Sequence, residues 1–227
     1  MYDAIHDNII YKLVYEEHIF MNNIIQFKKI VLKKDGSYMS KPIDKIYGKG
    51  ATEILNEFGD PNTIPINLNK LLENIGISVL PMDFTNLEEK LNKGHILGLV
   101  LTTENNAVIY YSINDTTNRQ RFTIAHELGH ICSHLRPDST DYPYIDWRIE
   151  EEANNCEEKK ANIFAGELLI PLHKLKQEYL SLRFPSSKEL ASIFGTSINV
   201  MEERLNHLKV SYFDKNGKAV VNTYDGQ

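Results

Sequence analysis

The chain lacks the features that mark secreted and membrane-spanning proteins. It has two cysteines, Cys132 and Cys156, in 227 residues, which excludes a disulfide framework and fits a reducing compartment. No apolar run reaches the length of a membrane span. The start of the chain, with Asp3, His6 and Asp7, has neither the basic nor the apolar region of a signal peptide. We therefore expect a cytoplasmic protein with no membrane partner.

Positive charge is also scarce. The chain has 25 Lys and Arg against 31 Asp and Glu, so its formal net charge is −6 and its pI is about 5.8. This balance argues against a general binder of nucleic acids or of anionic membranes. Hydrophobic residues make up 42% of the chain, which is enough for the core of one compact domain or of one and a half.

The most informative motif is HELGH at residues 126–130. Histidines four residues apart on a helix lie one turn above each other, so His126 and His130 can share one metal ion. Glu127 lies elsewhere around the helix, where a carboxylate can hold an activated water instead of ligating the metal. The spacing predicts a zinc hydrolase; the alternative is two surface histidines on an amphipathic helix.

The residues around this motif predict a helix that packs on other elements. Apolar residues at helical spacing form a stripe opposite the histidines. Thr117 and Gln120 form a predicted capping box that starts the helix about two turns before His126. Gly129 costs about 1 kcal/mol relative to Ala inside a helix, which suggests that another element packs closely there.

A third metal ligand must come from another part of the chain, since a catalytic zinc usually takes three. His134 continues the series of histidines, but a straight helix places it too far along the axis to share the same ion. Candidates remain in Asp138 and Asp141 of the following loop. Further candidates are the carboxylates of an acidic helix that we predict from Ile149 to Ile170, where Pro171 stops it.

Within this acidic helix, residue spacing favours Glu158. It shares a face with Ala161, Asn162 and Ala165, whose small or polar side chains would let the two helices lie close together. Glu151 lies on the same face two turns earlier and is the next choice. Most other acidic residues here are expected on a solvated face.

Two segments resemble the signatures of the ImmA/IrrE metallo-endopeptidases. They are RQRFTIAHELGH at residues 119–130 and EKKANIFAGELLIP at residues 158–171. The resemblance implies His126 and His130 as ligands, Glu127 as general base and Glu158 as the third ligand. A weaker likeness extends it over residues 50–208. Before the first segment the family often carries an asparagine at a strand end, whereas Ser112 stands in that register here.

The predicted fold class is α+β, with three segments. Residues 1–49 are an N-terminal extension, and residues 50–175 are a zincin-like core in which a small antiparallel sheet accompanies the active-site helices. Residues 176–227 are helix-turn-helix-like helices and a hairpin packed on the core. In the core, we predict that residues 97–102 and 107–113 form a hairpin that leads into the metal helix. The second of these strands could offer an edge to an extended peptide.

The C-terminal segment has the spacing of a helix-turn-helix over residues 187–208, with a turn at 195–197. Strands at residues 210–213 and 219–222 are predicted to follow as a hairpin. The second helix carries Asn199, Glu202, Glu203 and Arg204, which is too little positive charge to engage phosphates. We therefore expect a packing or protein-docking role and no nucleic-acid partner.

These observations predict a zinc-dependent endopeptidase with one zinc per chain, or manganese in its place. The resemblance implies a regulatory protein as substrate, such as a helix-turn-helix repressor. The group that stabilises the oxyanion stays open among Tyr142, Tyr144, His134 and Arg121. Two other functions also stay open: a DNA-binding regulator that uses residues 187–222, and a protein-docking regulator whose metal is structural.

Overall fold

The structure is a computed structural model, and it describes residues 42–91, 94–103, 106–134, 144–149, 156–183 and 185–221. The chain divides into two compact units, residues 1–40 and 41–227, and all described residues belong to the second unit. The expected N-terminal extension therefore lies outside the described residues up to residue 41.

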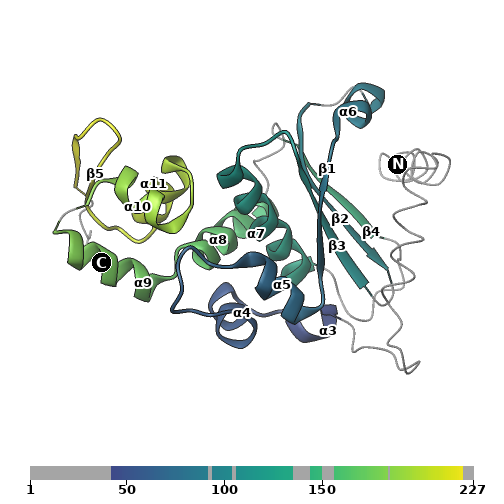
Figure 1. The fold of residues 1–227 in the computed structure, drawn as a ribbon, viewed down its shortest axis with the longest axis horizontal. Coiled ribbons are helices and arrows are strands. Elements are labelled where there is room, and N and C mark those ends of the chain that lie inside the picture. The colour runs from purple at the N-terminus through teal and green to yellow at the C-terminus, as the bar shows by residue number, and fades with distance from the viewer. Residues whose placement is uncertain are drawn as a thin grey trace. The chain divides into compact units, whose positions relative to one another are not determined.

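Four strands form one sheet in the order β1-β3-β2-β4 (Figure 1). β2 (Ile96–Thr103) is antiparallel to both β3 (Asn106–Ser112) and β4 (Tyr144–Ile149). β1 (Ser78–Met82), however, pairs with β3 in parallel, so the sheet is mixed and the prediction of an antiparallel sheet is wrong at β1. Parallel pairing needs a long crossover, and α6 (Thr85–Leu91) together with β2 provides it.

The strand order also corrects the prediction of a free edge at residues 107–113. β3 is paired on one side with β1 and on the other with β2, so it has no edge to offer. The edges of the described sheet are β1 and β4. β4 was not predicted: Ile149, where the acidic helix was expected to start, ends this strand, and α8 is described from Cys156.

Two long helices form the centre of the fold (Figure 1). α7 (Thr117–His134) contacts β2 and β3, and α8 (Cys156–Leu169) packs along α7. The expected close approach at Gly129 is confirmed, because a Cβ there would lie 3.2 Å from Cβ of Phe164 on α8. Ala161 and Ala165 are buried in the same contact, as their small size predicted.

Shorter helices complete the core around α7 and α8: α3 (Pro42–Ile46), α4 (Ala51–Phe58) and α5 (Leu68–Ile75). α4 contacts α8, and α3 and α5 contact α7. Ile43 and Ile46 of α3 are buried in the main hydrophobic cluster, although they precede the core boundary expected at residue 50. The apolar face of α3 is therefore part of this core.

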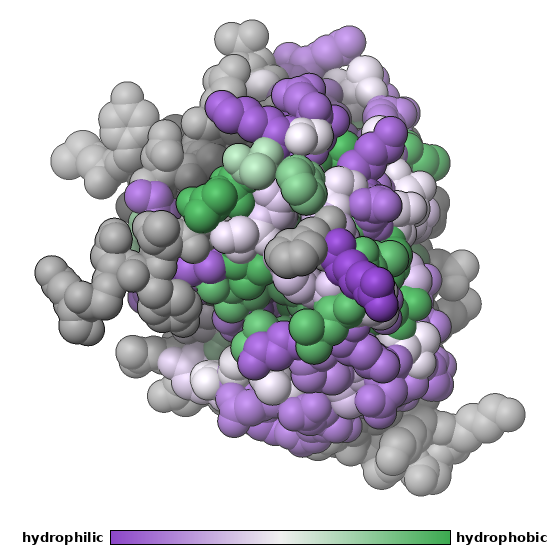
Figure 2. Space-filling view, turned by 90° about the vertical axis from the view of Figure 1, so that its left-hand side faces the viewer, coloured by the Kyte–Doolittle hydropathy of each residue, from purple (hydrophilic) through white to green (hydrophobic). Residues whose placement is uncertain are grey.

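The C-terminal helices are α9 (Leu172–Leu182), α10 (Ser187–Phe194) and α11 (Ile198–His207), followed by the two-stranded pair β5 (Tyr212–Phe213) and β6 (Ala219–Val220). They belong to the same compact unit as the sheet, and α11 contacts α8. Figure 2 looks onto the side that carries these helices, where apolar patches lie among hydrophilic residues. The exposed apolar residues of α9 and the hairpin region are Leu172, Leu180, Leu182, Phe213 and Val221.

None of the helices in the described ranges has an apolar stretch long enough to cross a bilayer.

The start of α7 differs by one residue from the predicted capping box. Thr116, rather than Thr117, caps the helix: its Oγ1 accepts a hydrogen bond from the Arg119 N–H at 3.4 Å. In the predicted capping box, the Gln120 side chain would bond to the backbone of the cap residue. Instead, its Nε2 donates a hydrogen bond to the carbonyl of Ser112 at 3.0 Å. Ser112 is the last residue of β3, so this bond connects the end of the strand with the first turn of α7.

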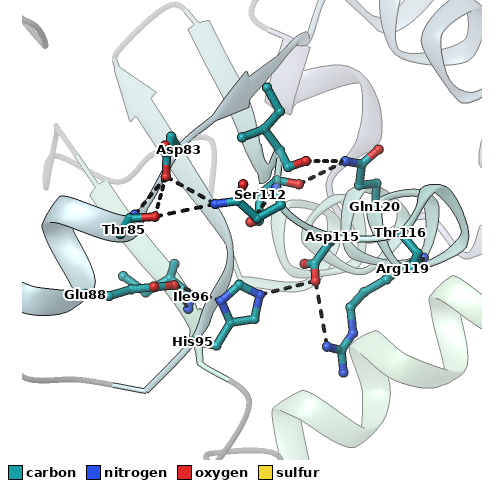
Figure 3. Close-up of polar contacts among 12 residues, drawn as sticks. Asp83, Thr85, Glu88, His95, Ile96, Ser112, Asp115, Thr116, Arg119 and Gln120 are labelled. Atoms are coloured by element: carbon teal, nitrogen blue, oxygen red, sulfur yellow. Dashed lines mark hydrogen bonds and ion pairs between the residues drawn. The ribbon is translucent and has the colours of Figure 1, made fainter.

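A polar cluster beside this cap joins α6, the start of β2 and the loop before α7 (Figure 3). His95 Nδ1 lies 2.9 Å from Glu88 Oε1, and its Nε2 lies 3.2 Å from Asp115 Oδ1. Glu88 also accepts the Ile96 N–H at 2.7 Å. Asp115 in turn lies 3.7 Å from Arg119 Nη1 on α7. One imidazole thus connects two carboxylates from separate elements.

This cluster makes stability depend on pH. Burial lowers the pKa of His95, but the hydrogen bonds and charges of Asp115 and Glu88 outweigh burial and raise it above the ordinary 6.5. The stabilisation is therefore complete below pH 6.5 and is lost as pH rises through the higher pKa of the folded state. We expect His95→Gln to lower the free energy of unfolding more at about pH 5.5 than at about pH 8.5, as measured by urea unfolding. An equal loss at both pH values would contradict this role.

Candidate metal centre

Two histidines and one glutamate converge where α8 crosses the middle of α7. Their ligand atoms all lie within 4.8 Å of one another. Glu158 Oε2 is 3.1 Å from His126 Nε2, and Glu158 Oε1 is 3.0 Å from His130 Nε2. The structure therefore brings together the three residues that were proposed as ligands from the sequence.

The site is largely shielded from solvent. His126 is fully buried, His130 is 7% exposed, and the side chain of Glu158 is 19% exposed. Burial alone would raise the pKa of Glu158, but hydrogen bonds to His126 and His130 and their charges hold it well below its ordinary value. An ionised carboxylate and two imidazole nitrogens form a donor set that suits a divalent transition metal.

Asn162 orients one of the histidines. Its Oδ1 lies 2.9 Å from His126 Nδ1, and an amide oxygen can only accept, so Nδ1 carries the proton. The other ring nitrogen, Nε2, faces Glu158 and is the atom of His126 that could bind a metal ion. Asn162 was predicted to share a helix face with Glu158, but no role was predicted for it. Its position one helical turn after a ligand was the available signal.

Glu127 occupies a gap that exists because β2 has a glycine at this point. Glu127 is 1% exposed. A Cβ on Gly98 would lie 2.6 Å from Thr123 Cγ2 and 3.0 Å from Glu127 Oε1, so any other residue would displace one of them. Gly98 also follows a register shift in the pairing of β2 with β4. Gly98 was not predicted from the sequence, since its importance comes from the close approach of a strand and a helix that are distant in the chain.

The other candidates from the sequence divide into two groups. Several lie outside the described residues: Asp138, Asp141, Tyr142 and Glu151. His134 ends α7 and Tyr144 begins β4, but their side chains are not described. Arg121 uses its guanidinium on main-chain carbonyls, with Nε 3.0 Å from Gly195 O and Nη2 3.0 Å from Ile66 O. These two bonds give Arg121 a structural role.

Cys132, two residues after His130, is buried. Burial raises the pKa of its thiol to about 12. The thiol therefore stays protonated at neutral pH.

The role of Asn162 predicts a defined change in metal affinity. Loss of a side chain that orients a histidine ligand typically weakens binding about 10- to 100-fold, so we expect this loss for Asn162→Ala. Asn162→Asp keeps an acceptor and should bind zinc at least as tightly as the parent. Competition with a chromophoric chelator would measure both affinities, with Lys160→Ala on the exposed face of α8 as the control. Parental affinity in Asn162→Ala would rule out the orienting role.

Comparison with known families agrees with this geometry. A family model described as the IrrE N-terminal-like domain, a peptidase family, matches residues 72–206, which is more than half of the chain. The matched segment includes the converging residues of α7 and α8 and ends within α11. No match was found among curated proteins or among solved structures. The chain thus belongs to the peptidase family of IrrE N-terminal-like domains.

Proposed function

We propose that the protein is a zinc-dependent endopeptidase, with manganese as the alternative metal. The observation that carries the proposal is a buried carboxylate, Glu127, which lies between two of three converging metal donors on α7, the third being Glu158 on α8. Structural zinc sites usually have four protein ligands, whereas catalytic sites have three and leave one position for water. Within the described ranges, the group that could hold a metal consists of three residues, which favours a catalytic site over a structural one.

The residues divide the chemistry among them. When bound, zinc supplies Lewis acidity, which makes water a better nucleophile and polarises a peptide carbonyl. His126 and His130 serve as neutral imidazoles, and Asn162 keeps His126 in the tautomer that would bind the metal through Nε2. Glu127 accepts a proton from the attacking water and transfers it to the nitrogen of the leaving amine.

The sheet suggests where an extended substrate segment binds. Gly98 of β2 lies beside Glu127, and β4 is the neighbour of β2 on the open side of the sheet. A peptide that pairs with the outer edge of β4 would therefore run two strands away from Gly98, about 10 Å in the hydrogen-bonding direction. β3, where we expected this edge, is covered on both sides.

We propose a regulatory protein as the substrate, such as a helix-turn-helix repressor. The basis is the family resemblance, together with the exposed apolar residues of α9 and the hairpin, which suit contact with a folded protein. The contacts of α11 give no support to DNA binding. Its one arginine, Arg204, is 7% exposed and is 3.2 Å from Glu167, so it is not available for phosphates.

The first test separates metal binding from catalysis. Glu127→Gln preserves the shape of the side chain but removes the proton acceptor, so we expect near-stoichiometric zinc and a fall in proteolysis by orders of magnitude. His126→Ala and Glu158→Ala should lose the metal as well. Metal analysis by mass spectrometry distinguishes these outcomes. Full zinc content in Glu158→Ala would place the third ligand elsewhere, with Glu151 next to be examined.

The second test concerns selectivity. A bound zinc polarises any carbonyl presented to it, so discrimination must come from which chains reach the site. We expect no digestion of casein and cleavage of one helix-turn-helix repressor at a single site, with slower cleavage after changes to exposed α11 residues such as Asn199. Efficient digestion of unrelated proteins would contradict this selectivity. Tight binding to duplex DNA at about 0.15 M salt would favour the regulator instead.

A further inference from the structure

A cleft runs along the seam between α7 and α8 and is bounded on its third side by α11. It consists of two adjoining cavities of about 380 Å³ and 360 Å³. Both cavities are lined by the same four residues: Phe122, Asn162, Val200 and Glu203. Beyond these four residues, the larger cavity extends along α8 to Gly166, and the smaller cavity extends to Leu97 of β2. The cleft is thus lined by residues of α7, α8 and α11.

The cleft lies beside the metal-ligand candidates, and none of these three residues is among those that line it. Asn162 lines both cavities, and its Oδ1 is hydrogen-bonded to the metal-ligand candidate His126. The ring of Phe122 lies one helical turn before His126, with the ring centroids 6.2 Å apart. In an extended peptide, successive residues advance about 3.3 Å, so a side chain within two or three residues of a bond at the metal would reach these walls.

The wall formed by α11 is held in place from α7. Asn118 donates its Nδ2 hydrogen to the Thr196 carbonyl at 2.9 Å, and Arg121 donates to the Gly195 carbonyl at 3.0 Å. Both carbonyls lie in the turn that precedes α11. The first turns of α11, which would read bases in a DNA-binding helix, here carry Val200 and Glu203 into the cleft.

The chemistry of the larger cavity favours an apolar side chain. Phe122, Val200 and the partly exposed Ile163 line the larger cavity, while the glycine at 166 leaves room beside them. A Cβ at Gly166 would meet nothing closer than Arg204 Cδ at 3.9 Å. The charged residues on these walls include both signs: Glu203 and Lys159 line the larger cavity, Arg204 is paired with Glu167, and Arg119 of the smaller cavity is paired with Asp115. We therefore expect neither an acidic nor a basic substrate side chain to be favoured in the cleft by charge.

The geometry points to a substrate subsite for a large apolar side chain, such as that of Leu or Phe, close to the scissile bond, with α11 as its specificity-determining wall. This inference rests on the proposed peptidase function and adds the class of side chain and the element that selects it. A cavity of this size accommodates one such side chain. The helix pair α10–α11 then serves the peptidase site directly.

Binding of peptides to the zinc-loaded, full-length Glu127→Gln protein tests the subsite without any cleavage. The probes are fluorescein-labelled, end-blocked peptides of sequence Ala-Ala-Xaa-Ala-Ala, in which Xaa is Leu, Phe, Lys or Glu, and the readout is fluorescence anisotropy. We expect the Leu and Phe peptides to bind at least about tenfold more tightly than the Lys and Glu peptides. Equal binding of all four, or the tightest binding by the Lys or Glu peptide, would overturn the inference.

Two variants fill the cleft from opposite walls. Val200→Trp on α11 and Gly166→Leu on α8 should each abolish the preference for Leu and Phe while zinc content and the circular dichroism spectrum stay at parental values. Ser192→Trp adds the same indole to the exposed face of α10, outside the cleft, and should keep the preference. If the preference for Leu and Phe peptides survives in both cleft variants, the inference is wrong. If Val200→Trp does not fold, the result with Gly166→Leu decides.

The binding experiment tests the subsite independently of whether the protein cleaves peptides. A preference for apolar peptides in the Glu127→Gln protein, combined with no cleavage by the parent, would retain the subsite and reject the endopeptidase. Cleavage by the parent with no preference in binding would retain the endopeptidase and reject the subsite.

Discussion

The close packing of α8 on α7 is the constraint on which the rest of the structure depends. Gly129 admits the Phe164 ring, and the buried Ala161 and Ala165 keep the two helices together along their seam. At this distance, Glu158 reaches both histidines of α7. Its charge is tolerated in this partly buried position because two imidazoles accompany it, and the histidines acquire a shared partner for the same reason. The distance between α7 and α8 thus determines how closely Glu158 approaches the two histidines.

The same seam relates the metal centre to the C-terminal helices. Toward the start of α7, the seam widens into the cleft, and the turn before α11 is fixed there by bonds from Asn118 and Arg121. Along the same helix, Gly98 lets β2 approach Glu127. A single helix therefore carries two candidate ligands, the candidate base and the anchors of the cleft wall, so its position relative to the sheet affects every part of the site.

The sequence predicted what depends on local periodicity. The positions of His126, His130 and Glu158 on one face of their helices follow from helical spacing. Strand order did not follow, because the pairing of β3 with both β1 and β2 is decided by contacts between distant segments. The role of Asn162 requires the mutual orientation of two helices, and that of Gly98 requires the distance between a strand and a helix. Neither quantity can be read from a pattern of residues.

Asn162 has one further consequence, because it contacts a metal-ligand candidate and also lines the cleft. A substrate group that strengthens the hydrogen bond between the Asn162 amide and His126 would favour the ring orientation of His126 that binds metal. Thermodynamic linkage then requires reciprocity: if substrate tightens metal binding by some factor, the metal tightens substrate binding by the same factor. When free zinc is limiting, such a protein would be loaded preferentially where its target is abundant. The supply of metal and the presence of substrate would then act together as one condition for activity.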